Sequence, residues 1–253
     1  MSFSEKKVIL ITGAGSGIGK KTAKVFLNAN YFVIFSGRNL KKLNNSIKEN
    51  QGTSENSLPI SCDVGNPSEV EKLFKEIKKK FKRLDVLFNN AGIFSTQKSA
   101  EKFSHKEWQK ILNTNVNGPF FCAKEAIKIM KKQSPKGGRI INNGSISAHS
   151  PRPLSLPYTV SKHAMTGLTK SIALDYRNDN ILCSQIDIGN ASTEITNTIS
   201  KGILQSDGTT KKEPVFDAEI VAKTVFQMAT LPSDSNILFL TIIANKMPYI
   251  GRG

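Results

Sequence analysis

Residues 7–19 read KVILITGAGSGIG, a short apolar run followed by a glycine-rich turn. The run 7–12 has the length and residue types of a buried strand, and a helical pattern over 18–29 follows the turn directly. Glycines at such a turn let the backbone approach a pyrophosphate, and the first helical turn offers free N–H groups. The segment therefore predicts the strand, turn and helix that bind a dinucleotide.

The alternation of strand-like and helical segments continues along the chain. Further strands are expected over 31–36, 58–62, 84–88, 138–144, 181–187 and 237–242. Helices are expected over 18–29, 39–50, 67–82, 104–132, 156–178 and 217–230. Apolar strands separated by helices indicate a parallel sheet that is covered on both faces. We therefore predict a doubly wound α/β fold of about seven strands, built as a single domain over residues 1–253.

Composition restricts the class of protein. The chain has 253 residues, of which 38% are hydrophobic, and no low-complexity tract. Cys62, Cys122 and Cys183 lie far apart without a CxxC pair or neighbouring histidines, so we predict buried free thiols and no metal site. The apolar run 8–11 is too short for a signal peptide, and no stretch approaches the ~20 apolar residues of a membrane span. We expect a soluble cytoplasmic protein with no membrane partner.

The chain is strongly basic, with 36 Lys+Arg against 20 Asp+Glu and a formal net charge of +16. Such a charge favours anionic partners in general. The densest run, 78–83 (KKKFKR), ends a segment whose apolar residues recur at helical spacing, so its lysines are interpreted as a solvated helix face. Neither an aromatic-lined basic sheet nor a reading helix is evident, and we expect no nucleic-acid partner.

The end of the second predicted strand bears on the choice of cofactor. It reads Phe35-Ser36-Gly37-Arg38-Asn39, without the acid that bonds the adenosine ribose of NAD. Arg38 offers a charge-assisted contact to a 2′-phosphate, although an exposed arginine at the start of a helix would look the same. Ser16 provides no second basic residue in the glycine turn. We expect a preference for NADP(H) that does not exclude NAD.

Tyr158 and Lys162 are four residues apart in the helix expected over 156–178, so their side chains lie on one face. A free tyrosine has a pKa near ~10, and a neighbouring ammonium group favours the phenolate. The lysine is therefore expected to lower the pKa of the tyrosine and make it a usable acid or base. Such a pair also occurs by chance in many helices.

Other polar residues are predicted at the edge where the strands end. Ser145 follows the fifth strand, where its hydroxyl group could hold a substrate carbonyl or a developing alkoxide. Asn89-Asn90-Ala91-Gly92 closes the fourth strand at the same edge, and Asn115 lies further along the chain.

Together these motifs resemble the short-chain dehydrogenase/reductase family, in order and spacing and over nearly the whole length. The matching segments are TGxxxGxG at 12–19, the third-strand Asp63, NNAG at 89–92, Asn115, Ser145 and YxxxK at 158–162. The resemblance implies a Rossmann-like fold, and it implies reversible hydride transfer between NADP(H) and a carbonyl/alcohol pair. The alternative is a non-catalytic NADP(H)-binding or sensor protein, since a fold does not by itself imply an activity.

The resemblance also implies which residues act. The catalytic group is Asn115, Ser145, Tyr158 and Lys162. Ser145 would hold the carbonyl, Tyr158 would deliver the proton, and Lys162 would lower the pKa of the tyrosine and bind the ribose. Asn115 would position a water that links the lysine to solvent. The cofactor-binding residues would be Gly13, Gly15, Ser16, Gly17, Ile18, Gly19, Arg38, Asp63, Val64, Asn89, Ala91, Gly92, Tyr158, Lys162, Gly189 and Thr193.

One segment departs from the family pattern, and a second segment has two possible roles. After the sixth strand the family usually has Pro-Gly and then a threonine, whereas this chain has Ile188, Gly189 and Thr193, so the turn lacks its proline. The polar segment 200–214 is either a mobile lid over the substrate or a plain surface loop. His149 and His163 are interpreted as structural or substrate-lining.

The assembly and the substrate are less defined. The long helices expected over 104–132 and 156–178 resemble those with which the family builds dimers and tetramers, so a homotetramer or homodimer is expected. The substrate is a small carbonyl or alcohol compound. Its identity depends on residues around 94–103, 147–157 and 190–215.

Overall fold

A central parallel sheet organises the molecule, as seen in the computed structural model, which describes residues 6–193 and 202–250. Its seven strands lie in the order β3-β2-β1-β4-β5-β6-β11, and all neighbouring pairs are parallel. Their bounds are β1 Val8–Thr12, β2 Phe32–Gly37, β3 Ser57–Ser61, β4 Val86–Asn89, β5 Gly138–Asn143, β6 Ile181–Ile188 and β11 Phe239–Ile242. The predicted doubly wound fold is confirmed.

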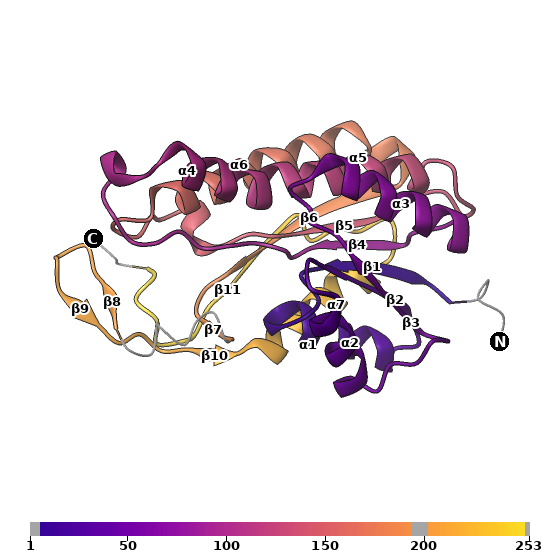
Figure 1. The fold of residues 1–253 in the computed structure, drawn as a ribbon, viewed down its shortest axis with the longest axis horizontal. Coiled ribbons are helices and arrows are strands. Elements are labelled where there is room, and N and C mark those ends of the chain that lie inside the picture. The colour runs from indigo at the N-terminus through magenta and orange to yellow at the C-terminus, as the bar shows by residue number, and fades with distance from the viewer. Residues whose placement is uncertain (1–5, 194–201, 251–253) are drawn as a thin grey trace.

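Helices cover both faces of the sheet (Figure 1). One layer contains α1 (Gly17–Asn28), α2 (Leu40–Glu49) and α7 (Ala218–Thr230). The other contains α3 (Pro67–Phe81), α4 (His105–Leu112), α5 (Gly118–Met130) and α6 (Leu156–Asp175). No helix within residues 6–193 and 202–250 is long and apolar enough to span a lipid bilayer.

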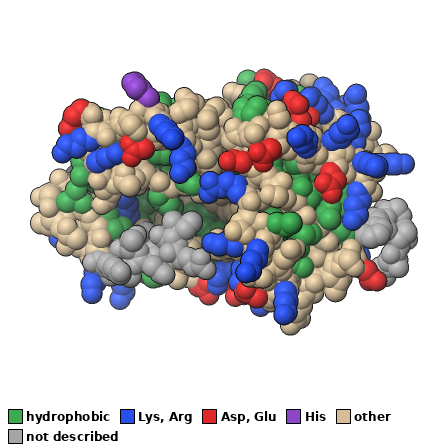
Figure 2. Space-filling view, viewed as in Figure 1, with side chains coloured by type: hydrophobic (Ala, Val, Ile, Leu, Met, Phe, Trp, Pro, Cys, Tyr) green, Lys and Arg blue, Asp and Glu red, His purple; other side chains and the backbone are tan. Residues whose placement is uncertain are grey.

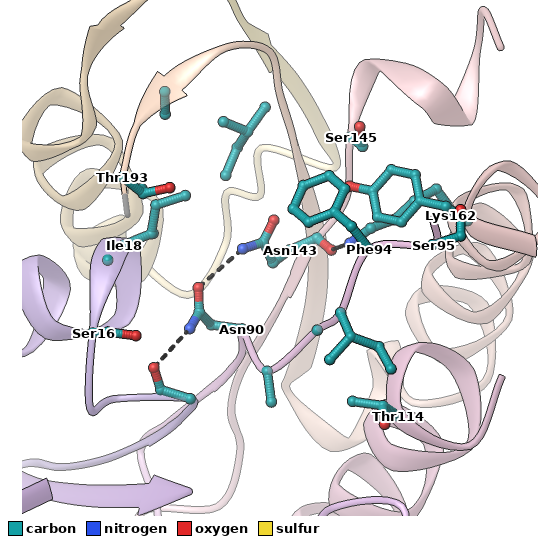
Figure 3. Close-up of a pocket in the computed structure, with 18 of the residues that line it drawn as sticks. Ser16, Ile18, Asn90, Phe94, Ser95, Thr114, Asn143, Ser145, Lys162 and Thr193 are labelled. Carbon is teal, nitrogen blue, oxygen red and sulfur yellow. Dashed lines mark hydrogen bonds between the residues drawn. The ribbon is translucent and has the colours of Figure 1, made fainter. Parts of the chain in front are cut away.

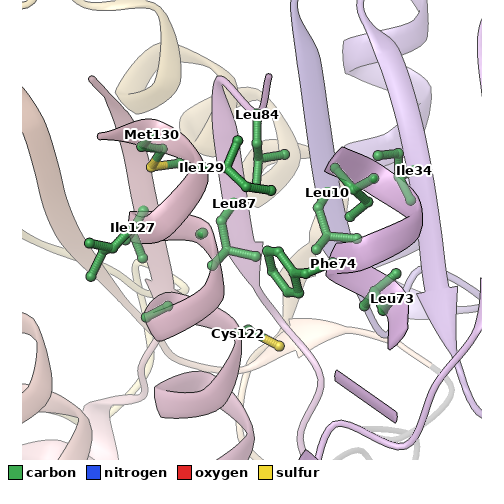
Figure 4. Packing of buried hydrophobic residues seen from close by; sticks show 14 of the residues in the cluster. Leu10, Ile34, Leu73, Phe74, Leu84, Leu87, Cys122, Ile127, Ile129 and Met130 are labelled. Atoms are coloured by element: carbon green, nitrogen blue, oxygen red, sulfur yellow. The ribbon is translucent and has the colours of Figure 1, made fainter. Parts of the chain in front are cut away.

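Two hydrophobic clusters form, one on each face, because side chains alternate along a strand. Val8 and Leu10 of β1 contribute to the cluster beneath α3 and α5, where Leu10 packs among Phe74, Leu87 and their neighbours (Figure 4). Ile9 and Ile11 contribute to the cluster beneath α1 and α7. The strand is therefore apolar at consecutive positions, which is the pattern seen in the sequence.

The three cysteines are buried and free, as expected. Burial raises the pKa of the Cys62 thiol to about 12, and it raises the pKa of Cys122 and Cys183 as well. A thiol with so high a pKa is rarely a thiolate at neutral pH, so these side chains act as small apolar groups.

The lysines of 78–83 lie where the helical pattern places them. Helix α3 buries Val70, Leu73, Phe74 and Ile77, while its lysines face solvent. Figure 2 shows Lys and Arg side chains close together over this part of the surface.

The prediction of a single helix over 104–132 is wrong in detail. The structure divides it into α4, a π-helical turn η2 (Asn113–Asn117) and α5. Pro119 stands in the first turn of α5 and has no N–H group, so it cannot donate to the carbonyl of Asn115 four residues earlier. The regular hydrogen-bond pattern therefore changes at the one asparagine of this helix that the resemblance singles out.

Several short elements lie outside the predicted pattern. Two-residue strands form the parallel pair β7 (Ala191–Ser192) with β10 (Phe216–Asp217), and the antiparallel pair β8 (Ile203–Leu204) with β9 (Thr210–Lys211). Among residues 6–193 and 202–250 there are also three 3₁₀ turns: η1 Ala100–Lys102, η3 Ile146–Ala148 and η4 Arg177–Asp179. Elements of two or three residues are too short to show a hydrophobic period, so the sequence gives no sign of them.

Candidate active site

A cleft of about 910 Å³ runs along the edge where the parallel strands end. Its walls come from the glycine turn after β1, the ends of β2, β4, β5 and β6, and the first turns of α6 (Figure 3). Ligands bind at this edge in open α/β sheets, near the point where the strand order reverses. Here that point lies between β1 and β4.

The glycine turn has the shape that a pyrophosphate requires. Gly13 and Gly17 have positive φ angles of 68° and 53°. A Cβ atom on Gly13 would lie 3.0 Å from the Cα of Ala91, and one on Gly19 would lie 2.5 Å from the carbonyl oxygen of Gly13. Helix α1 begins at Gly17, with Ser16 as its N-cap. The backbone thus forms a tight cradle at a helix N-terminus, where an anion is stabilised.

Asn90 holds this cradle in place, although it was not among the predicted site residues. Its side chain donates to the carbonyl of Thr12 at 2.8 Å. It accepts from Nδ2 of Asn143 at 3.0 Å (Figure 3). Its backbone N–H donates to the hydroxyl of Thr12 at 3.0 Å. The glycine turn is therefore connected to the end of β5.

Three predicted residues do not line the cleft. Asn89 points into the core, where its amide donates to Asn142 at 2.9 Å, because alternate residues of a strand face opposite sides. Gly19 lies buried behind the turn. Asn115 is buried and binds both backbone groups of Ile93, at 2.8 and 2.9 Å. Gly19 and the side chains of Asn89 and Asn115 therefore support the walls of the cleft.

The other predicted residues border the cleft. They are Gly13, Gly15, Ser16, Gly17, Ile18, Arg38, Asp63, Val64, Ala91, Gly92, Ser145, Tyr158, Lys162, Gly189 and Thr193.

Two basic side chains border the end of the cleft next to β2. Arg38 follows the strand and is exposed. Lys42 of α2 lies beside the glycine turn, since a Cβ on Gly15 would be 3.2 Å from the Cβ of Lys42. Lys42 could not be predicted as a site residue because it is one lysine among several on a polar helix. Only the packing of α2 brings it to the turn.

Tyr158 lies in the first turn of α6 and keeps part of its surface exposed to the cleft. Its surroundings raise the pKa of Tyr158 to about 12: burial is the main cause, and it outweighs the hydrogen bond with Ser145 and the charge of Arg152. The ring of Phe94 stacks on the tyrosine with centroids 4.6 Å apart. The expected lowering of this pKa by Lys162 is therefore not seen in the chain by itself.

Lys162 lies one helical turn further and is 7% exposed. Its ammonium group donates to the carbonyl of Asn143 at 2.7 Å and lies 5.6 Å from the centre of the Tyr158 ring. Burial lowers the pKa of Lys162 to about 8. The lysine is thus fixed between the end of β5 and the tyrosine.

The turn after β6 is fixed without proline. The N–H of Gly189 donates to the carbonyl of Ile242 on β11 at 2.9 Å, and the N–H of Ala191 donates back to Gly189 at 2.9 Å. A Cβ on Gly189 would lie 3.0 Å from side chains of Ile243 and Met247. Thr193 borders the cleft next to Gly17.

The segment 200–214 borders the cleft through its first described residues, Gly202 and Ile203, while 200–201 lie outside the described residues. The β8–β9 hairpin that follows is anchored by Glu213, whose side chain is 1% exposed. Its carboxylate accepts from Arg152 at 2.7 and 3.0 Å and from Asn190 at 2.8 Å. The described part of the segment is therefore tied to the loop that precedes Tyr158.

The two histidines lie apart from the walls of the cleft. His149 follows η3 and contacts the carboxylate of Asp187 at 2.7 Å. His163 is exposed on α6 and contacts the carbonyl of Thr159 at 2.9 Å.

Known proteins resemble the chain in sequence and in structure. A family model described as short chain dehydrogenase matches residues 7–203. A 3beta-hydroxysteroid dehydrogenase of Mediterraneibacter gnavus is 35% identical over 203 residues, covering 80% of this chain and 72% of the relative. The 3-oxoacyl-[acyl-carrier-protein] reductase FabG of Buchnera aphidicola is 33% identical over 200 residues, covering 78% of each. The solved structure of ElxO with NADP bound superposes with a TM-score of 0.80 at 31% identity, covering 94% of this chain and 97% of the other.

The pairing of Glu213 with Arg152 leads to a prediction for stability. Burial disfavours the charge of Glu213, but the hydrogen bonds from Arg152, Asn190 and Gln205 outweigh it and lower its pKa to about 2. Glu213→Gln leaves the buried arginine without its counter-charge, so we expect the free energy of unfolding to fall by about 3 kcal/mol at pH 7. Thermal denaturation followed by circular dichroism measures this loss.

The pH dependence of the free energy of unfolding tests the direction of this effect. A lowered pKa stabilises the fold above the unfolded value of 4.5, and this stabilisation is lost as the pH falls toward 2, so the difference between wild type and variant should shrink over that range. Asp207→Asn on the same hairpin is the control, because Asp207 is exposed and should change the melting temperature little. A Glu213→Gln protein as stable as wild type at pH 7 would contradict the anchoring role.

Proposed function

Because the chain belongs to the short-chain dehydrogenase/reductase family, we propose that it is an oxidoreductase that transfers a hydride between NADP(H) and a carbonyl or alcohol substrate. One observation carries the proposal: a single cleft brings together the glycine cradle and the group Ser145, Tyr158 and Lys162. A protein that only senses the nucleotide has no need of this second group.

The cleft suits a dinucleotide along its whole length. The pyrophosphate is assigned to the cradle at Gly13–Gly19, whose close packing against Asn90 and Ala91 leaves no room for a Cβ atom at Gly13 or Gly19. Asp63 and Val64 border the adenosine end, and Gly189 and Thr193 border the opposite end. When bound, the nicotinamide supplies or accepts the hydride.

Side chains of the protein carry out the proton transfer. The hydroxyl of Ser145 is assigned to hold and polarise the carbonyl oxygen. Tyr158 is assigned as the proton donor in reduction, and its raised pKa of about 12 keeps the phenol protonated until a substrate oxyanion forms. The ammonium group of Lys162 then lies close to the phenolate and stabilises it. Asn115 is assigned to position a water that links Lys162 to solvent.

The substrate end of the cleft carries apolar side chains beside polar ones such as Ser95, Thr96 and Gln97. Ile93, Phe94 and Ile203 border it, and Arg152 is already neutralised by Glu213. These residues favour a carbonyl group on an apolar body. Two relatives are named for a hydroxysteroid and for an oxoacyl group, which both fit this description.

We further propose that residues 1–253 act as one dinucleotide-binding and catalytic domain in the cytoplasm. One sheet takes strands from Val8 to Ile242, which supports a single domain. Three buried free cysteines are consistent with a reducing compartment.

The first prediction for this function concerns Tyr158→Phe. This change removes the phenolic proton but keeps the ring, so we expect carbonyl reduction to fall by at least ~10²-fold while NADPH binding is retained. A panel of ketones assayed by NADPH absorbance, together with NADPH titration by fluorescence, measures both effects. Tyr176→Phe, at the far end of α6, is the control with unchanged turnover. A variant that keeps more than about a tenth of the activity would exclude this role.

The second concerns the choice of cofactor. Gly37 leaves room for a 2′-phosphate where an acid would repel it, and Arg38 and Lys42 border the same end of the cleft. One charge-assisted bond contributes ~1.5–3 kcal/mol, so wild type should bind NADPH about ten- to a hundredfold more tightly than NADH. Gly37→Asp/Arg38→Leu should remove this preference, and Lys42→Leu should weaken it.

Dissociation constants for both reduced cofactors test these effects. Arg177→Leu is the matched control, because it removes one positive charge far from the cleft and should leave the preference unchanged. Equal wild-type affinities, or a double variant that still prefers NADPH, would show that Arg38 is only a surface charge.

The third concerns assembly, which we propose to be a homotetramer or homodimer formed through the layer of α4, α5 and α6. Phe120 of α5 is 48% exposed and Leu174 of α6 is 60% exposed, so a second copy would cover apolar surface there. Light scattering at micromolar concentration should give an oligomeric mass, and Leu174→Glu should lower it. Ile220→Glu, on α7 in the opposite layer, is the control. A monomeric wild type would refute the assembly.

A further inference from the structure

A buried carboxylate lies behind the active site and has no part in the mechanism described so far. Asp187, near the end of β6, has a side chain that is 1% exposed. Its Oδ1 accepts from the backbone N–H of Ser145 at 3.0 Å and from Nε2 of Gln185 at 2.7 Å. Its Oδ2 lies 2.7 Å from Nε2 of His149. A buried carboxylate needs partners of this kind, because its desolvation is costly.

The backbone is shaped to let this carboxylate reach the serine. A Cβ atom on Gly144 would collide with Oδ1 of Asp187 and would lie 2.9 Å from the side chain of Gln185. The residue before Ser145 must therefore lack a side chain if the carboxylate is to accept from the serine's N–H. The position of Ser145 and that of Asp187 thus depend on each other.

The electrostatic surroundings connect the carboxylate to the proton-transfer groups. Burial is the main cause of the raised pKa of Tyr158, and the charge of Asp187 raises it further. Burial lowers the pKa of Lys162, and the same charge opposes that lowering. The titratable and charged groups facing this region are His149 after η3, Arg152 before α6, Tyr158 and Lys162 on α6, and Tyr249 in the C-terminal segment.

We propose that Asp187 and His149 are positioning residues: the carboxylate fixes the backbone at Ser145 and sets a negative charge behind Tyr158, and His149 holds the carboxylate in place. This inference rests on the proposed oxidoreductase function. The side chain of His149 is 43% exposed and contacts the carboxylate, so it lies between the buried Asp187 and solvent.

The sign of the effect follows from the charges. A negative charge near Tyr158 keeps the phenol protonated to higher pH, and it also favours the charged form of Lys162. Both are the forms that carbonyl reduction uses. Removing the negative charge should therefore lower the pKa of Tyr158, and placing a permanent positive charge beside the carboxylate should lower it as well.

The first test needs neither cofactor nor substrate. Asp187→Asn keeps the shape of the side chain and its acceptor for Ser145 but removes the charge. Tyrosinate absorbance at ~pH 10.5 should show about tenfold more Tyr158 phenolate than in wild type, which corresponds to one pKa unit. Each protein is measured against the same protein carrying Tyr158→Phe, so that ionisation of Tyr31, Tyr176 and Tyr249 is subtracted. An unchanged phenolate fraction in the folded variant would overturn the electrostatic role.

The second test uses the pH profile of NADPH-dependent carbonyl reduction. Its alkaline limb should move down by about one pH unit in Asp187→Asn. It should also move down in His149→Arg, which places a permanent positive charge beside the carboxylate. Circular dichroism checks that this variant folds. His163→Arg adds the same charge on the outside of α6 and should leave the profile in place. If Asp187→Asn fails to fold, His149→Arg decides, and an unmoved profile overturns the proposal.

The two tests separate this inference from the proposed function. A wild-type protein that reduces no carbonyl compound, but whose phenolate fraction responds to Asp187→Asn, would contradict the oxidoreductase assignment and keep the charge coupling. An active enzyme whose phenolate fraction does not respond to Asp187→Asn would support the oxidoreductase assignment and contradict the charge coupling.

Discussion

All seven strands of the sheet run in the same direction, and the site depends on that constraint. Parallel strands place all their carboxyl ends at one edge, so segments far apart in the chain meet there. Thr12, Asn90, Ser145 and Gly189 become neighbours of one cleft in this way. The apolar clusters on both faces make the sheet rigid enough to hold these ends in register.

Polar groups become buried at this edge of the sheet, and their desolvation costs free energy. The structure offsets the cost with hydrogen bonds between elements. Asn90 joins the ends of β1 and β5, Asp187 joins the end of β6 to Ser145, and Glu213 joins the β8–β9 hairpin to the loop before α6. Each link orders a wall of the cleft, and each contains a group that would be unfavourable if its partner were missing.

Much of the fold and of the candidate site could be predicted from the sequence, with exceptions at Asn89 and at η2. The strand and helix pattern, the glycine turn and the Tyr158–Lys162 pair depend on spacing within a few residues, which the sequence displays. Asn89 was assigned to the cleft because its motif is there, but the alternation of the strand directs its side chain into the core. The break at η2 arises from one proline inside an otherwise helical pattern.

The sequence by itself determined the local geometry of this protein: a strand, a glycine turn and a helix that form a phosphate cradle, and a tyrosine and a lysine on one helical face. Only the tertiary structure decided the environment of those groups. It brought Lys42 beside Gly15 and Asp187 behind Ser145, and it buried Tyr158 enough to raise its pKa, where the spacing of the lysine had suggested a lowering. The reason is physical, since backbone conformation and helical spacing act over a few residues, whereas desolvation and charge depend on whatever the fold packs nearby.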